Sequence, residues 1–527
     1  MKNPLSVHLG AILIPGLILL TSFLVFNYIQ KRLAKNAKNV TSYPPEPPGA
    51  WPVIGHLPLL NTRTHIAHPL SKLADKLGPV FTLRLGMQRV VVVSSREAVM
   101  ECFTANDKFF ANRPKSSAGE HLVYNHASFG FSNGPYWREM RKLVMLEVLS
   151  PRRLESMRNL RVSEIGTSIR ELYLETKVGF PVKVTISRWI EQLTLNIIVR
   201  TIAGIRYGNG SENGEVERFR GLFRELTFLS GEFVLSDVIP FPFLKMLDLQ
   251  GYVKRMKSVA KELDAIIEKW IDEHVQRRGK GEGVRDDQEQ DFIDVMLSTV
   301  DDKFESYGVP RRTIIKATVV NVVLGGFDTM SVYLSWLLAL LINHKKVLNQ
   351  AQQEIDSKIG KQKWVQESDI KNLPYLQSII KEALRLYPPL PLSIPHEAVQ
   401  DCHLSGYFIP KGTLLFVNLL KLHRDPRFWS DPDRFMPERF LNSGAETDAL
   451  GQQFEFIPFG SGRRSCPGST FAMQVTNLTI ARLIQGFDFD APGGLDVDMS
   501  EGVAITMPRA NALEVMLSPR LDSRLYI

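Results

Sequence analysis

Apolar residues recur with helical spacing along the second half of the chain. The longest such pattern runs from residue 313 to residue 341 and contains two glycines, an aspartate and a threonine within residues 325–329. A second stripe follows Pro374 and consists of Leu376, Ile379, Ile380, Ala383 and Leu384. Repeats at intervals of three and four residues are typical of amphipathic or buried helices. The two patterns therefore predict a long helix and a shorter one after it.

Residues 9–29 show a different pattern, with 21 residues that carry no formal charge. A membrane-spanning helix needs about 20 such residues, whereas the apolar run of a cleaved signal peptide has about 7–15 and ends at a small-residue cleavage site. No such site follows. Lys31, Arg32, Lys35 and Lys38 follow the run, and only Lys2 precedes it. Because positive charge stays on the cytosolic side, we expect a single-pass anchor at residues 1–30 and a cytosolic catalytic domain.

Residues 31–52 join this anchor to the rest of the chain. They are basic at first and then rich in proline, which favours an extended spacer over a helix. After residue 50 the only strongly polar, breaker-rich stretch is residues 277–291, which we interpret as a solvated loop. We therefore expect residues 53–527 to form one catalytic domain.

Composition excludes several classes of function. The net charge of +8 comes without a basic and aromatic stripe, so nothing indicates nucleic-acid binding. The chain has three cysteines, Cys102, Cys402 and Cys466. Three thiols cannot build a four-cysteine zinc or iron–sulfur site, and so few cysteines fit a reducing compartment.

One cysteine stands in an unusual loop, residues 459–468, with the sequence FGSGRRSCPG. Glycines let the backbone turn tightly there, and its N–H groups can then point at the sulfur of Cys466. A lone cysteine is usually a structural thiol. The alternative is a single thiolate ligand to haem iron, the ligand that favours O–O cleavage.

The loop resembles the haem-ligand signature of the cytochrome P450 monooxygenases at each fixed position. By that resemblance Cys466 is the proximal thiolate of heme b, Arg464 contacts a haem propionate and Phe459 packs beside the sulfur. The resemblance also implies the P450 fold, which is mainly α, with about a dozen helices and a smaller β-rich region near the N-terminal part.

Two glycines inside the long predicted helix cost about 1 kcal/mol each relative to alanine, so they need a reason. Close packing against another backbone is one, and opening the helix beside a flat ligand is the other. In the family this segment activates oxygen, and Asp328 and Thr329 match its acid and its threonine, which relay protons. Phe327 and Met330 depart from the family pattern, and we expect them to make the pocket more apolar and tighter.

Other segments also resemble family motifs. Glu382 and Arg385, spaced as E-x-x-R, are completed by Arg439 and imply a structural brace behind the haem. Trp137 and Arg141 match a W-x-x-x-R pair that holds one propionate, since residues four apart share a helix face. His396 stands where the family often places another propionate-binding residue.

Residues 136–142 (YWREMRK), Phe440 after Pro-Glu-Arg and residues 460–468 (GSGRRSCPG) resemble the plant microsomal branch of the family, which serves specialised metabolism. The resemblance implies insertion of one oxygen atom from O2 into a lipophilic small molecule such as an alkaloid, terpenoid or flavonoid. It also implies an endoplasmic reticulum location and electrons from NADPH through cytochrome P450 reductase. A P450-fold isomerase or dehydratase that needs no O2 and a non-catalytic haem-binding protein remain the alternatives. Hydroxylation, demethylation, desaturation and ring formation all begin with the same hydrogen abstraction, and the motifs are compatible with each.

Two surface features have two interpretations each. Basic residues on and beyond the W-x-x-x-R segment (Arg138, Lys142, Arg152 and Arg153) are either ordinary solvated charges or a docking face for an acidic electron donor. Residues 113–124, 233–243, 322–329, 391–394 and 504–506 are expected to border an apolar substrate pocket. Residues 238–244 are equally suited to dipping into a membrane surface.

Overall fold

Helices form most of the part of the chain that the computed structural model describes, which is residues 42–60, 64–175, 179, 181–208, 214–280, 290–442 and 453–527. The predicted anchor and the first part of the hinge lie outside these residues. Within them, the helices of eight residues or more are α3 (Ala67–Leu77), α4 (Arg96–Phe103), α6 (Gly134–Leu143), α8 (Arg158–Glu175), α9 (Ile186–Ala203), α10 (Glu215–Gly231), α13 (Tyr252–Gly279), α14 (Phe292–Thr299), α16 (Arg311–Asn343), α17 (Lys345–Lys358), α18 (Pro374–Leu386) and α21 (Ser469–Gly486).

Short helices connect these elements. They are α2 (Leu57–Leu60), α5 (Ser117–His121), α7 (Pro151–Ser156), α11 (Leu235–Val238), α12 (Pro242–Leu247), α15 (Asp302–Glu305), α19 (Leu419–Leu422) and α20 (Arg439–Asn442). A π-helical turn, Val144–Val148, follows α6, and 3-10 turns occupy Glu367–Asn372, Gly462–Arg464, Pro492–Gly494 and Ser523–Leu525.

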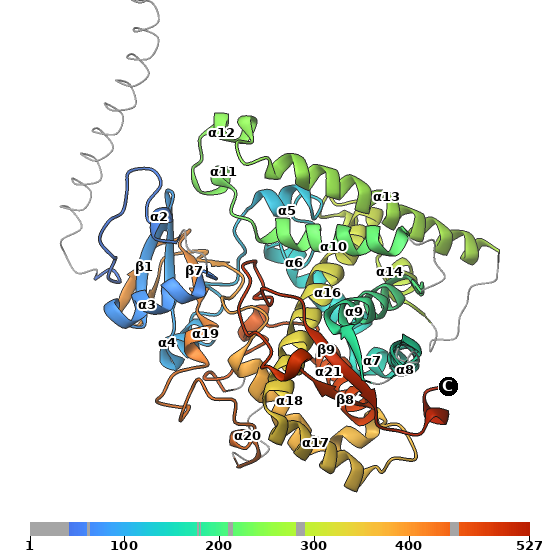
Figure 1. Cartoon of the computed structure of the whole chain (residues 1–527). Coiled ribbons are helices and arrows are strands. Elements are labelled where there is room, and N and C mark those ends of the chain that lie inside the picture. Colours follow the sequence, from blue (N-terminus) through green and yellow to red (C-terminus); the bar gives the residue numbers. More distant parts are fainter. Residues whose placement is uncertain are drawn as a thin grey trace, which may run out of the picture.

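The long helix α16 runs through the middle of the molecule (Figure 1). Its apolar residues are not confined to one stripe because helices α9, α10, α13, α17, α18 and α21 pack around it. Among the described residues α16 is the one helix long and apolar enough to span a membrane, but most of it is buried inside the protein. The predicted boundaries for this helix are confirmed within two residues, and the helix is continuous through its glycines.

Strands gather in small sheets beside the helices. The first sheet has the order β1 (Val80–Leu85), β2 (Gln88–Val93), β7 (Leu414–Val417) and β4 (His396–Glu397). Strand β2 pairs antiparallel with β1 and parallel with β7, so that Val90 lies opposite Leu414. The second sheet has the order β3 (Val182–Thr185), β9 (Glu514–Pro519) and β8 (Phe487–Asp490), and β5 (Cys402–Leu404) pairs with β6 (Tyr407–Ile409).

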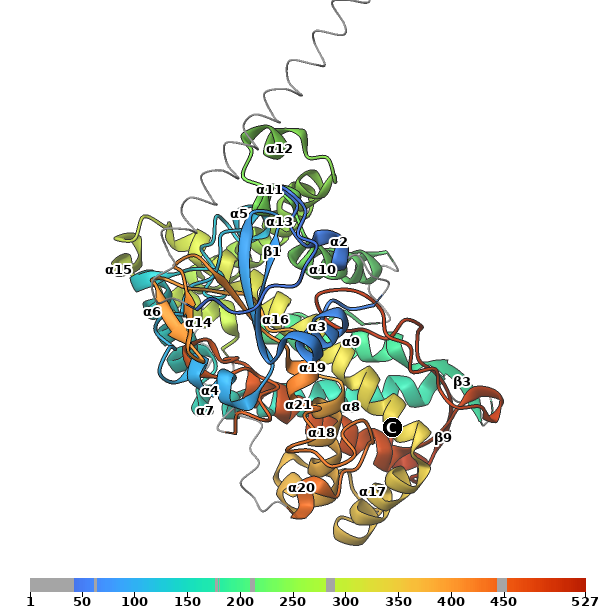
Figure 2. The ribbon, with the colours of Figure 1, turned by 90° about the vertical axis from the view of Figure 1, so that its left-hand side faces the viewer.

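The first sheet and the short helices α11 and α12 lie on the same side of the molecule, with α12 at its margin (Figure 2). Two contacts join them. The Met87 N–H in the β1–β2 turn donates to the Val238 carbonyl at 2.9 Å, and Gly86 lies so close to Val238 that a side chain would overlap its backbone.

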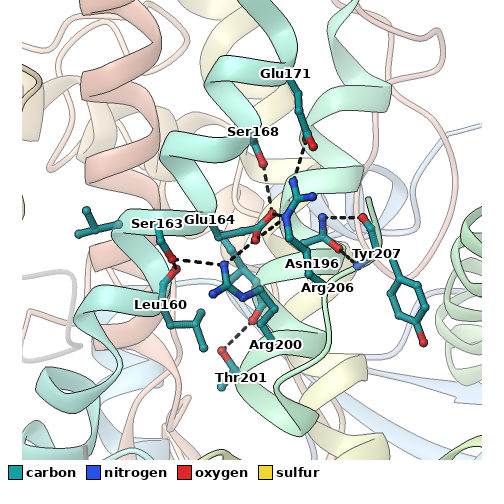
Figure 3. A network of polar contacts seen from close by, with 12 residues as sticks. Leu160, Ser163, Glu164, Ser168, Glu171, Asn196, Arg200, Thr201, Arg206 and Tyr207 are labelled. Atoms are coloured by element: carbon teal, nitrogen blue, oxygen red, sulfur yellow. Dashed lines mark hydrogen bonds and ion pairs between the residues drawn. The ribbon is translucent and has the colours of Figure 1, made fainter. Parts of the chain in front are cut away.

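A buried polar network fastens α8 to α9 and to the segment after α9 (Figure 3). The fully buried carboxylate of Glu164 accepts from Arg200 Nη1 at 2.7 Å and from Arg206 Nε at 3.1 and 3.0 Å. Arg206 also reaches Glu171 at 2.8 Å. Two guanidinium groups on one carboxylate satisfy a charge that is otherwise strongly destabilising in a core.

Candidate functional site

The thiol loop, residues 459–468, is a tight turn that leads directly into α21. The Cys466 N–H donates to the Phe459 carbonyl at 2.9 Å, and the Ser465 N–H donates to the Gly462 carbonyl at 3.1 Å. Gly460 and Gly462 have φ values of +70° and +67°, which other residues adopt only under strain. At Gly462 a β-carbon would also lie 2.4 Å from Asp107. The glycines of the loop are therefore required by its shape.

The sulfur of Cys466 lies at the N-terminal end of α21. Burial raises the pKa of this thiol, and the Gly468 N–H, the Arg141 guanidinium and the Ser469 N–H oppose that effect. The side chain nevertheless has accessible surface. The two N–H groups and the guanidinium beside this accessible sulfur favour the thiolate form that binds metals.

Three guanidinium groups, those of Arg113, Arg141 and Arg464, form a guanidinium cluster beside the thiol loop. Arg141 Nη2 donates to the Ser465 carbonyl at 2.6 Å. Arg464 donates to the carbonyls of Ala111, Phe129 and Ser132 and to the Asn133 side chain. Burial, then Arg113 and Arg141, lower the pKa of Arg464.

Arg113 completes the cluster and was not singled out from the sequence. Its Nη1 donates to the carbonyls of Ile394 and Pro395 at 2.9 and 2.7 Å. Its Nε is buried without a hydrogen-bond partner among the described residues, and no described carboxylate forms an ion pair with any of the three guanidinium groups. Burial and Arg141 lower the pKa of Arg113 to about 10. A cluster of half-buried cations that no described carboxylate neutralises is chemically suited to bind anionic groups.

Trp137 and His396 border this cluster. The Arg464 guanidinium lies 3.8 Å from the ring centroid of Trp137. His396 Nδ1 is 2.8 Å from the Phe110 carbonyl, so this nitrogen carries the proton. Burial and the charges of Arg113 and Arg464 lower the pKa of His396 well below its ordinary value. The imidazole is therefore neutral unless an anion approaches it.

Most of α16 is buried, but part of one of its faces is open. The open stripe consists of Val322, Gly325 and Thr329, of which Gly325 is exposed and the others half-buried. A β-carbon on Gly325 would meet nothing within 4 Å, whereas one on Gly326 would lie 2.4 Å from Ile198 Cδ1 in α9. Gly326 therefore permits close packing, although against a side chain and not against a backbone, and Gly325 leaves space on the face of a helix that stays continuous.

Asp328 and Thr329 hold their polar atoms in different places. Thr329 Oγ1 donates to the Gly325 carbonyl at 2.6 Å, within the helix. Asp328 Oδ2 accepts from Thr506 Oγ1 at 2.6 Å. Burial raises the pKa of Asp328, which makes this carboxyl a more effective proton donor and acceptor near neutral pH.

Phe327 and Met330 belong to the core and not to the open stripe. Phe327 is fully buried, and its ring meets that of Phe223 in α10 at 5.7 Å between centroids. Met330 is buried as well. The expectation that Phe327 and Met330 make the pocket more apolar and tighter stays a prediction.

Glu382, Arg385 and Arg439 come together in a buried group, which we call the brace. Glu382 accepts from Arg385 Nε and Nη2 at 2.7 and 2.8 Å and from Arg439 Nε at 3.0 Å. The remaining donors of Arg385 reach the carbonyls of His423, Pro432 and Arg434. The brace thus fixes α18 against the segment that precedes the thiol loop.

Comparisons with known proteins agree with this geometry. The family model described as Cytochrome P450 matches residues 44–513. Vinorine hydroxylase of Rauvolfia serpentina is 52% identical over 96% of this chain and 97% of its own length. A nicotine N-demethylase of Nicotiana tabacum is 49% identical over 97% and 99% of the two chains.

Two further matches are more distant. A flavonoid-6-hydroxylase of Ocimum basilicum is 46% identical over 97% of both chains. A solved zebra fish cytochrome P450 with abiraterone has a TM-score of 0.70 at 25% identity and covers 86% of this chain and 99% of its own.

Proposed function

The chain belongs to the cytochrome P450 family and is a haem-thiolate monooxygenase, and on that basis we propose a role for each group of the site. Its relatives are named as hydroxylases and an N-demethylase, and the segments that match the family extend over nearly the whole chain. The roles of individual residues, the membrane anchor and the redox partner are the finer parts of the proposal.

The residues present fit a haem. Its two propionates are carboxylates, and the guanidinium cluster offers half-buried cations that no described carboxylate neutralises. We propose that Arg113, Arg141 and Arg464 hold the propionates, assisted by the Trp137 indole N–H and by His396. An approaching propionate favours protonation of His396, because Nδ1 already donates to Phe110 and only a protonated ring offers a second donor.

We propose that Cys466 would hold the haem iron through its thiolate and that Phe459 would pack beside the sulfur. The N–H groups of Gly468 and Ser469 stabilise negative charge on the sulfur without protonating it. When bound, haem supplies the oxidation chemistry, by which one atom of O2 enters the substrate and the other leaves as water. The protein supplies the ligand, the protons and the shape of the pocket.

Protons are proposed to pass through Asp328 and Thr329 on α16. The open stripe leaves room for water beside Gly325, and Thr329 presents its hydroxyl to that space while donating to the Gly325 carbonyl. A carboxyl whose pKa is raised toward neutrality can collect protons from solvent and release them again. The brace does no chemistry in this scheme and keeps α18 and the thiol loop in fixed positions.

The substrate is proposed to be a small lipophilic plant metabolite. The relatives act on vinorine, nicotine or a flavonoid by their names, and the described segments expected to border the pocket are largely apolar. A spectral binding screen over alkaloid, diterpenoid and flavonoid libraries, followed by product mass, identifies it. A product heavier by one oxygen atom indicates hydroxylation, whereas a rearranged product formed without NADPH and O2 points to the isomerase alternative.

We propose that the domain rests on the endoplasmic reticulum membrane beside its anchor. Four apolar residues on and after α12 are exposed, namely Phe243, Met246, Leu247 and Leu249. Met246 is 87% exposed, and a group of exposed apolar side chains is typical of a surface that meets a membrane or another protein. For the reductase we propose the face of α6, where Arg138 and Lys142 are exposed and Met145 and Leu146 lie open beside them.

The accessible thiol at the start of α21 carries this proposal. If a cysteine thiolate holds the haem iron, the reduced carbon monoxide complex would show a red-shifted absorption band. We expect the full chain to show this band and Cys466→Ser to lose it. A band retained in Cys466→Ser contradicts the assignment of the ligand.

A further inference from the structure

Asp328 is held by a residue far from it in the sequence. Thr506 lies in the turn between Glu501 and Arg509, which pair as an isolated antiparallel bridge. Its hydroxyl donates to Asp328 Oδ2 at 2.6 Å, a short distance that is typical of a hydroxyl on an ionised carboxylate. Thr506 is 2% exposed, so water does not compete for this bond.

The turn that carries Thr506 is fixed on both sides. The Met507 N–H donates to the Pro389 carbonyl at 3.0 Å, and Trp336 Nε1 donates to the Met507 carbonyl at 2.6 Å. On the other side Ile505 lies against Gly231, where any β-carbon would be 2.4 Å from Ile505 Cβ. The hydroxyl of Thr506 is therefore presented to α16 by a rigid support that reaches α10, α16 and the segment after α18.

Charged groups face Asp328 from the other elements packed against it. The contact of Phe223 with Phe327 sets α10 against α16, and the residues that follow these two are Arg224 and Asp328. Arg224 lowers the pKa of Asp328 and forms an ion pair with Glu191 of α9. Thr506 also lowers it, whereas burial, the largest effect, raises it. Asp328 therefore lies between a desolvating core and two groups that favour its charged form.

We propose that Thr506 is a positioning residue of the proton relay, which holds the Asp328 carboxylate in one orientation while the Arg224–Glu191 pair balances its charge. The inference rests on the relay role proposed above for Asp328. A carboxylate that is free to rotate presents its oxygens to the open stripe for only part of the time. A fixed carboxylate delivers protons on the side of Gly325 and Thr329 in every cycle, which reduces the release of peroxide.

Thr506→Val tests this proposal, because valine keeps the shape and removes the donor. A hydrogen bond to a charged group shifts a carboxyl pKa by about one unit, so the Asp328 carboxyl should titrate about one pH unit higher in Thr506→Val. Infrared difference spectra against Asp328→Asn isolate the C=O band of this carboxyl without turnover. With reductase, NADPH and a substrate found by the spectral screen, we expect several-fold less product and more H2O2 per NADPH, with the acid limb of the rate profile displaced to higher pH.

Two matched variants complete the test. Thr318→Val is the control. It removes a buried threonine hydroxyl on α16 that donates to the Ile314 carbonyl of the same helix, and it should leave the titration of Asp328 and the coupling unchanged. Thr506→Ser keeps the donor and should restore both. An Asp328 band that titrates alike in Thr506→Val and the unaltered protein overturns the proposal, as does unchanged coupling. If Asp328→Asn itself remains fully coupled, the relay role fails, and the infrared titration still decides whether Thr506 holds the carboxyl.

Discussion

The contact between Gly326 and Ile198 allows a prediction with a worked magnitude. A methyl group at position 326 would lie 2.4 Å from Ile198 Cδ1 and 3.2 Å from Ile198 Cγ1, and Ile198 is buried in the central core. Alanine in a helix interior is about 1 kcal/mol more favourable than glycine. Overpacking a core costs about 1–3 kcal/mol. We expect Gly326→Ala to lower the free energy of unfolding by about 1 kcal/mol.

The chain offers a control and a rescue for this change. At the neighbouring Gly325 a methyl group meets nothing within 4 Å, so Gly325→Ala should raise the free energy of unfolding by about 1 kcal/mol. Ile198→Val removes the Cδ1 atom and alone costs about 0.5–1.5 kcal/mol. In the double variant the added methyl occupies the freed space, so the two changes should be coupled by about 1–3 kcal/mol in the favourable direction.

Guanidinium unfolding of the four variants and the unaltered protein, followed by tryptophan fluorescence, measures these differences. A more stable Gly326→Ala would show that α9 and α16 yield at this point. Additive effects of Gly326→Ala and Ile198→Val would show that the clash is not with Cδ1. Either result refutes the assignment of Gly326 to close packing.

Three further predictions concern other parts of the molecule. Glu382→Gln leaves two guanidinium groups of the brace without a full counter-charge, so we expect the free energy of unfolding to fall by about 3–5 kcal/mol and the haem-to-protein ratio to fall as well. Glu217→Gln, at an exposed ion pair, should lower the free energy of unfolding by less than about 1 kcal/mol. Ser117 Oγ donates to Asp237 Oδ1 at 2.6 Å and joins α5 to α11 at the expected pocket border. Ser117→Ala should therefore raise the substrate association rate up to tenfold in stopped-flow experiments. An unchanged rate would show that these segments do not limit substrate entry. Met246→Asp places a charge on the exposed tip of α12 and should weaken vesicle binding of the chain without residues 1–30 more than tenfold, whereas equal binding would place the membrane elsewhere.

Local spacing was sufficient to predict some of the site. The interval of four residues between Trp137 and Arg141 and of three between Glu382 and Arg385 places each pair on one helix face, and the structure has both pairs on helices. The helix boundaries followed in the same way from apolar periodicity. These predictions succeed because each depends on contacts within a few residues of the chain.

The places of Arg113 and Thr506 in the site could not be predicted from local spacing. Arg113 occupies an ordinary polar loop in the sequence, and only the fold brings it beside Arg464 and the carbonyl of Ile394. Thr506 is 178 positions from the carboxylate that it meets. The contact of Phe327 with Phe223 of α10 could not be predicted either, because a helix position alone does not reveal which neighbouring helix will cover it.

The pairing of β2 with β7 has a consequence for how the protein is made. Strand β2 ends at Val93, and its parallel partner begins at Leu414, so the hairpin of β1 and β2 leaves the ribosome long before β7 exists. Until then the valine-rich β2 presents an unpaired edge, the kind of surface that associates with other strands. We expect the nascent chain to depend on chaperones during this interval, and completion of this sheet to be a late and slow step of folding.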